Sequence, residues 1–210
     1  MTSARLADPP LLVLHTLHLS GFVDTDRLAQ RTGVEEDRVL EILEQARNDG
    51  YVVERSGRVS GWILTPEGRA AHARLLADEL AERGCRAQVE AAHEAFLALN
   101  EPFKEICTAW QLRPGGSPND HSDPAYDAAV IGDLKALHPQ VVTVTAGLAT
   151  VLPRFARYEH DFTAALDRLR TGDTRALAAP LSGSYHDHWM ELHQDLLSTL
   201  GRERSAADGH

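Results

Sequence analysis

A chain of 210 residues is long enough for one large or two small domains, and 43% hydrophobic with 25% charged residues is ordinary for a globular protein. No apolar run is long enough to cross a bilayer, and no basic segment followed by a hydrophobic one opens the chain. We therefore expect a cytoplasmic protein with no membrane partner. Cys85 and Cys107 lack metal-ligand spacing, so neither a cysteine metal site nor a disulfide framework is predicted.

Acidic residues outnumber basic ones along the whole chain, and the net charge is −10. Residues 1–83 carry ten arginines against fourteen acids, and the remainder carries eleven lysines and arginines against seventeen acids. A domain that grips duplex DNA normally has a basic surface, because neutralising phosphates supplies most of its sequence-independent affinity. The overall charge therefore argues against DNA binding, and any contact with DNA would have to come from a local basic edge.

The first predicted elements are short helices. Pro9 and Pro10 can open a helix that runs to Ser20, and Asp24 or Thr25 can cap the next one. Residues 31–33, Arg-Thr-Gly, form a tight turn to a further helix that residues 48–50, Asn-Asp-Gly, end. Helical spacing places six apolar residues on one buried side of this pair: Leu28, Val34, Val39, Leu40, Leu43 and Ala46.

The apolar period changes from helical to two after residue 50. Residues 51–53 enter a strand, Ser56 and Gly57 turn it, and Val59, Trp62 and Leu64 return it toward the core. Together with the two preceding helices, this pattern predicts a helix-turn-helix followed by a two-stranded wing.

The runs GVEEDRVLEILEQARNDGYV and GWILTPEGR resemble the recognition helix, wing and wing-to-helix step of MarR-type winged helix-turn-helix transcriptional regulators. The resemblance covers about the first 80 residues and implies binding to double-stranded DNA. Acids occupy most of the start of the expected recognition helix, where they would repel phosphates. A narrow basic edge is still expected from Arg27, Arg31, Thr32, Arg38, Arg47, Arg55 and Arg58.

The second part of the chain is predicted to be helical throughout. A helix begins after the Thr65 cap and ends near Gly84, which separates a domain over 1–83 from one over 84–210. Residues 86–110 form a long helix that Pro102 interrupts near Leu99. A loop over 113–124 follows, and then come helices over 126–137, 140–158, 159–170 and 184–200. The predicted fold is mainly α: an N-terminal winged helix-turn-helix with a two-stranded wing, then an all-α bundle.

Polar residues gather around the predicted loop and on the apolar sides of its neighbouring helices. Polar groups in such positions need internal partners or a ligand. The sequence leaves these two alternatives equal: a hydrogen-bonded network that fastens the loop, or a small-molecule site. The candidate ligand residues are Asn100, Lys104, Trp110, Gln111, Asn119, Asp120, His121, Tyr126, His186, Trp189 and His193.

A second resemblance covers most of the chain. The runs FKEICTAWQLRPGGSPNDHSDPAYDAAV and SYHDHWMELHQDLLSTLG are similar to the C-terminal extension of actinobacterial proteins of the pyruvate phosphate dikinase type. That resemblance implies an alternative function, in which the winged helix binds no DNA and the chain is an accessory module for a metabolite or a partner enzyme.

Histidines are concentrated in the second part of the chain. His186 and His193 lie seven residues apart, so one face of the last helix carries both, and His160 from another segment could complete a site for a divalent metal. No cofactor is required by any motif. Structural histidines are the alternative. A third hypothesis is a small enzyme that uses the loop over 119–121 and the C-terminal histidines, although the chain has no glycine-rich phosphate loop and no nucleophile elbow.

These observations combine into one functional hypothesis. The chain is expected to be a homodimeric DNA-binding regulator in which a small-molecule effector bound near the bundle loop changes the spacing of two winged helices and so their affinity for DNA.

Overall fold

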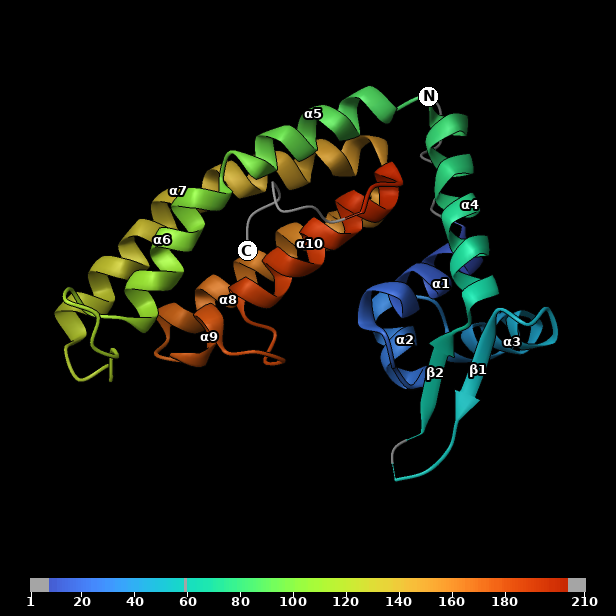
Figure 1. Ribbon diagram of the computed structural model, residues 1–210, viewed down its shortest axis with the longest axis horizontal. Coiled ribbons are helices and arrows are strands. Elements are labelled where there is room, and N and C mark those ends of the chain that lie inside the picture. Colours follow the sequence, from blue (N-terminus) through green and yellow to red (C-terminus); the bar gives the residue numbers. More distant parts are fainter. Residues whose placement is uncertain (1–7, 59, 204–210) are drawn as a thin grey trace. The chain divides into compact units, whose positions relative to one another are not determined.

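The computed structural model describes residues 8–58 and 60–203, and Val59 lies outside them. The described chain is mainly helical with one small antiparallel sheet (Figure 1). It divides into a first unit of residues 8–85 with 197–203, and a second unit of residues 86–196. None of the helices described is both long enough and apolar enough to cross a membrane.

The first unit begins with three helices, and local signals set their ends. Asp24 Oδ1 accepts a hydrogen bond from the backbone N–H of Arg27 at 2.8 Å, as the sequence predicted for this cap. Gly33 has a φ of 68°, which ends the second helix and turns the chain into the third. The helices are α1 Pro9–Ser20, α2 Thr25–Thr32 and α3 Glu36–Asn48.

The sheet of the first unit pairs β1 Val52–Arg55 with β2 Gly61–Leu64 in antiparallel register, Val52 opposite Leu64. Val23, which follows α1, adds an isolated bridge to Trp62 through two backbone hydrogen bonds of 2.8 and 3.3 Å. The chain between α1 and α2 therefore lies beside β2.

Helix α4, Pro66–Arg83, begins with the cap that the sequence predicted. Thr65 Oγ1 accepts a hydrogen bond from the N–H of Gly68 at 2.9 Å and donates one to the carbonyl of Gly50 at 2.7 Å. The same threonine thus joins the start of α4 to Gly50, which lies just after the end of α3.

The core of the first unit is formed by α1, α2, α3 and the sheet. Leu28, Val39 and Leu43 are fully buried, as predicted, and Val34 is half-buried against them. The prediction for Leu40 is wrong: 39% of its surface is exposed. Val39 and Leu43 face the core from α3. Leu40 follows Val39 in the chain and therefore lies one position around the helix, on the solvent side.

The second unit starts with α5, Arg86–Leu97, and α6, Asn100–Gln111. The predicted interruption near Leu99 is confirmed. Pro102 is the third residue of α6, where a missing N–H costs no helical hydrogen bond. In Figure 1, α5 and α6 lie end to end along one long helix, α7, Pro124–Val151.

That long helix corrects a sequence prediction. Residues 126–137 and 140–158 were expected as separate helices, but α7 runs unbroken as Pro124–Val151 with an exposed Pro139 inside it. The buried stripe of Leu134, Leu137 and Val141 continues across the proline, so packing holds the helix together there.

A short 3-10 turn, η1 Pro153–Phe155, then leads into α8, Ala156–Arg170, so Tyr158 belongs to α8 rather than to the preceding helix. A single turn of helix, α9 Arg175–Ala178, precedes the last helix, α10 Tyr185–Leu200. Residues 197–203, which include the end of α10, belong to the first unit, whereas the sequence assigned everything after residue 83 to the second.

A buried ionic network joins η1, α8 and α10 inside the second unit. Arg154 forms an ion pair with Asp195, and the two side chains are each 2% exposed. The other carboxylate oxygen of Asp195 accepts a hydrogen bond from Tyr158 at 2.8 Å, and burial raises the pKa of that phenol well above its ordinary value. Tyr158 therefore stays protonated as a donor.

Candidate functional site

A pocket of about 440 Å³ lies between α6 and α10 in the second unit. Its size is within the range of small-molecule sites, which are typically about 300 to 1,000 Å³. Six of the predicted ligand residues line it, and Phe103, Cys107, Thr108 and Met190 complete its walls. The six predicted residues are Asn100, Lys104, Gln111, His186, Trp189 and His193.

The two helices present these residues because their spacing matches the helical period. On α6 the lining residues recur every three or four positions from Asn100 to Gln111, and on α10 they do so from His186 to His193. The start of α10 is fixed by reciprocal hydrogen bonds of 3.1 Å, in which Asp187 N–H donates to Ser184 Oγ and Ser184 N–H donates to the Asp187 carboxylate.

Stacked aromatic rings form one wall of the pocket. The rings of Phe103 and Trp189 are nearly parallel, at 20°, with centroids 4.1 Å apart. The indole N–H of Trp189 donates a buried hydrogen bond of 3.0 Å to Asn100 Oδ1. This bond fixes the orientation of the indole, so the wall is preformed.

Lys104 supplies the positive charge of the pocket. Its Nζ lies 3.0 Å from Glu101 Oε1 one helical turn away, and the two side chains are 35% and 78% exposed. Ion pairs this exposed contribute about 0 to 1 kcal/mol, so the ammonium group can exchange this partner for another anion at little cost.

Cys107 is a neutral group on the same wall, since burial raises the pKa of its thiol to about 12. In a Cys85→Ala variant, Cys107 is the one thiol left, and its reaction with a disulfide reagent at pH 8 should be tens of times slower than in the urea-unfolded chain. The rate should keep rising with pH above 9, where an unfolded thiol levels off. Equal rates in folded and unfolded protein would contradict this.

Other predicted ligand residues lie in the loop after α6, where they bond to one another. Asn119 Nδ2 donates to the Trp110 carbonyl at 3.1 Å and to Asp127 Oδ1 at 2.9 Å. His121 Nδ1 lies 3.0 Å from Asp127 Oδ2, and its ring packs on that of Trp110 with centroids 4.5 Å apart. His121 holds a positive φ of 60° within this network. These hydrogen bonds fasten the loop to α6 and α7, which is the internal network that the sequence offered as one of its two alternatives.

The remaining loop candidates also have internal partners. The Tyr126 hydroxyl donates a hydrogen bond to the carbonyls of Ala109 and Leu112, at 2.9 and 3.0 Å. Asp120 accepts bonds from the hydroxyl and the backbone N–H of Ser122, which lower the pKa of this exposed carboxyl. The enzyme hypothesis, which uses residues 119–121, stays a prediction.

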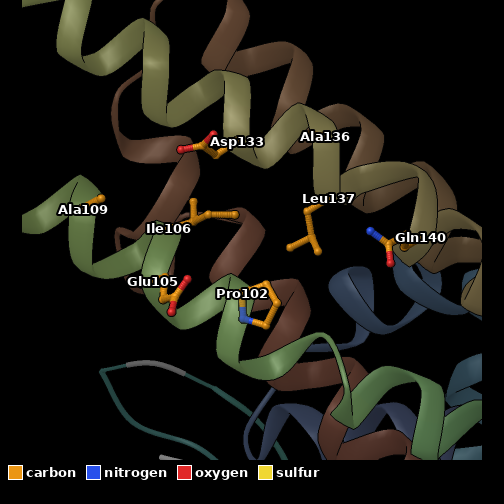
Figure 2. Close-up of a pocket in the computed structure, with 8 residues that line it drawn as sticks. All are labelled: Pro102, Glu105, Ile106, Ala109, Asp133, Ala136, Leu137 and Gln140. Atoms are coloured by element: carbon orange, nitrogen blue, oxygen red, sulfur yellow. The ribbon is translucent and has the colours of Figure 1, made fainter.

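A second hollow, of about 420 Å³, lies between α6 and α7. Figure 2 shows Ile106 from α6 and Leu137 from α7 extending into the space between the two helices. The carboxylates of Glu105 and Asp133 also line it, so this hollow is acidic. The two hollows share helix α6 and differ in the charge of their walls.

The arginines predicted to bind DNA lie on α2, α3 and the sheet. Arg27 on α2, Arg55 at the end of β1 and Arg58 in the turn after it are exposed, and in the described part of the chain they take part in no ion pair. Arg31 is half-buried at the end of α2. Thr32 is half-buried, and its hydroxyl donates to the carbonyl of Leu28 at 2.7 Å, as helix-end threonines often do.

The two arginines of α3 are paired with acids of the same helix or the sheet. Arg38 Nη1 lies 2.7 Å from Glu41 Oε2. Arg47 forms an ion pair with Glu44 and a longer one, of 3.8 Å, with Glu54 of β1. All of these groups are at least 45% exposed, so the pairs are weak.

The histidines predicted to bind metal are not gathered into a metal site. Across residues 8–58 and 60–203, no three His, Cys, Asp or Glu side chains are arranged to hold a metal ion. His186 and His193 line the pocket on α10, whereas His160 is exposed on α8.

Sequence reasoning missed four residues of the pocket wall: Phe103, Cys107, Thr108 and Met190. A signal for them exists, because each is three or four positions from a predicted residue on the same helix. Comparisons with protein-family models, with curated proteins and with solved structures gave no match.

Proposed function

We propose that this chain is a DNA-binding transcriptional regulator of the winged helix-turn-helix type whose second unit senses a small molecule. The observation that carries the proposal is the order of elements in the first unit: α2, a tight turn at Gly33, α3 and the antiparallel pair β1–β2. The isolated bridge between Val23 and Trp62 fastens the segment before α2 to β2 and so fixes the sheet beside the helix pair.

The charges of the first unit support phosphate contacts at α2 and the wing. Arg27, Arg55 and Arg58 are exposed, and phosphate contacts by such side chains give sequence-independent affinity. Glu36 and Asp37, exposed in the first turn of α3, would repel the backbone at the place where base reading usually occurs. The proposed contact is therefore dominated by the wing rather than by α3.

The pocket between α6 and α10 supports the sensing part of the proposal. In a homodimer, an effector that binds one arrangement of the two copies better than another would shift the population toward it and change the spacing of the two wings. Because such a dimer has two-fold symmetry, its operator is expected to be palindromic. The two half-sites would lie about 34 to 36 Å apart on the DNA.

The variant Arg58→Gln tests the wing contact. Losing one phosphate contact should lower the slope of log affinity against log salt by about one unit. Fluorescence anisotropy with a duplex from the gene's own upstream region, at several salt concentrations, measures that slope. Arg170→Gln is the matched control, because Arg170 is an exposed arginine of α8 paired with Asp167. Absence of any complex at low salt would overturn the proposal.

A second candidate function is docking of the first unit onto a partner protein, and the exposed face of α3 favours it. This face combines Glu36, Asp37 and Glu41 with Leu40, 39% of whose surface is exposed. A double variant Glu36→Gln, Asp37→Asn separates the two candidates. Removing these acids should tighten DNA binding if α3 lies near phosphates, and should weaken capture of a basic partner protein if α3 is the docking face.

A further inference from the structure

We infer that His15, His18 and His72 form a pH-sensitive histidine cluster inside the first unit, which holds α1 to α4 at neutral pH and loosens when the solution becomes acidic. The inference goes beyond the proposed function, because it concerns the stability of the first unit and holds whether or not that unit binds DNA. Residues 8–85 and 197–203 contain these three histidines and no others, and all three lie in the one cluster.

The contact between the rings is the first observation. Nδ1 of His15 on α1 lies 2.9 Å from Nε2 of His72 on α4, and the two residues are 4% and 2% exposed. The ring of His18, one helical turn after His15, stacks on that of His72 with centroids 4.5 Å apart. Its Nε2 lies 3.0 Å from the hydroxyl of Ser198 near the end of α10. The cluster therefore joins three segments of the first unit.

The hydrogen bond between His15 and His72 limits how many protons the pair can hold. One of the two nitrogens must carry the hydrogen, and the other must accept it with a lone pair. The bond can form when the pair is neutral or carries one positive charge. A second added proton gives both nitrogens a hydrogen, breaks the bond and places two buried cations side by side, where they repel each other strongly.

The surroundings of the cluster offer little charge to offset that repulsion. Helix α1 packs against α2, α3, α4 and β2, and neither α1 nor β2 contains Asp, Glu, Lys or Arg. On α2, α3, α4 and residues 197–203, the charged side chains are exposed, apart from Arg31, Glu79 and Arg83. Two of these three are themselves cations. Glu79 lies two helical turns after His72 and forms an ion pair of 3.9 Å with Arg83.

The difference in proton uptake between the folded and the unfolded chain sets the direction of the effect. In an unfolded chain each histidine gains a proton at about pH 6.5. Below that pH the two unfolded histidines hold one proton more than the folded pair, so the equilibrium constant for opening of the first unit rises about tenfold for each pH unit. The cluster thus stabilises the first unit fully at neutral pH, and this stabilisation is lost as the pH falls.

The test is hydrogen exchange of the full chain, resolved by peptide, at several pH values from about 5 to 7.5. Protection factors, which divide out the pH dependence of exchange from a free peptide, should fall in α1 and α4 by about tenfold for each pH unit below about 6.5. In the variant His72→Gln this fall should flatten, because the glutamine amide can replace Nε2 as the partner of His15 but cannot titrate.

The matched control is His160→Gln, since His160 is exposed on α8 and lies outside the cluster. Its protection factors in α1 and α4 should follow those of the parent chain at every pH. An equally steep fall in the parent chain and in His72→Gln would overturn the inference.

Proton NMR of the parent chain keeps the test decisive if His72→Gln does not fold. The ring C2–H signals of His15 and His72, assigned through bond correlations, should titrate together in two steps that are about one pH unit or more apart. Independent titration of the two rings, each in a single step at about pH 6.5, would overturn the inference.

Discussion

Asp195→Ala is expected to destabilise the second unit by about 3 to 5 kcal/mol, which is typical of breaking a buried ion pair. The change removes a carboxylate that pairs with the Arg154 guanidinium, and both side chains of that pair are only 2% exposed. It also removes the acceptor of the Tyr158 hydroxyl, whose hydrogen bond of 2.8 Å is buried. The free energy of unfolding from urea titration, followed by circular dichroism, measures the effect.

The control for this variant is Asp167→Ala on α8. Asp167 also forms an ion pair with an arginine, Arg170, but the two side chains are 61% and 57% exposed. Surface pairs contribute about 0 to 1 kcal/mol, so the control should change little. Similar losses of unfolding free energy in the two variants would show that the buried ion pair contributes no more to stability than the exposed one.

Gly68→Ala is expected to open the junction between the sheet and α4. A Cβ atom at Gly68 would lie 1.9 Å from the carbonyl oxygen of Tyr51 and 2.8 Å from its carbonyl carbon. That carbonyl is itself fixed, because it accepts the backbone N–H of Thr65 at 2.9 Å. Since the overlap is with backbone, we expect a loss at or above the upper end of the about 1 to 3 kcal/mol that overpacking usually costs.

Hydrogen exchange resolved by peptide would measure this loss, since it reports α4 and the wing separately from the second unit. Gly132→Ala on α7 is the matched control. A Cβ there meets nothing within 4 Å, so alanine should stabilise α7 by about 0.5 to 1 kcal/mol through its higher helix propensity. Unchanged exchange in α4 and the wing of the Gly68→Ala variant would contradict the steric argument.

Much of the local structure could be predicted from the sequence because its causes are local. The caps of Asp24 and Thr65 need only a side-chain oxygen and the next turn of backbone. Gly33 tolerates the positive φ that ends α2, and Pro102 stops the helix that would otherwise join α5 to α6. The weak pairs of Arg38 with Glu41 and of Arg47 with Glu44 are also three residues apart on one helix.

The errors came from positions where packing outweighed local preference. Two helices were predicted over 126–137 and 140–158, but α7 is unbroken there, because the buried stripe continues on both sides of Pro139. Leu40 fits the apolar spacing, yet it lies one position around the helix from the buried Val39 and is exposed to solvent. Neither outcome follows from residue type, since each depends on which neighbouring elements cover the helix.

The candidate site was predictable as a set of residues but not as an arrangement. The polar side chains near the loop were expected to have either internal partners or a ligand, and the structure divides them. Asn119 and His121 hydrogen-bond with Asp127, whereas Lys104 and Gln111 lie on the pocket face of α6. Spacing within α6 shows which residues share a face, but the facing helix α10 is 74 or more positions away in sequence.

The sequence by itself thus determined the helical class, the capped starts of α2 and α4, the turn from α2 to α3 and the acidic charge of both parts, because these depend on single residues or on neighbours within one turn. The tertiary structure alone decided that α6 and α10 enclose a pocket in which Lys104 is joined by neutral side chains such as Gln111 and Thr108, that Arg154 and Asp195 are buried together, and that the end of α10 belongs to the first unit. Each of these joins segments distant in the chain, and long-range packing sets such contacts.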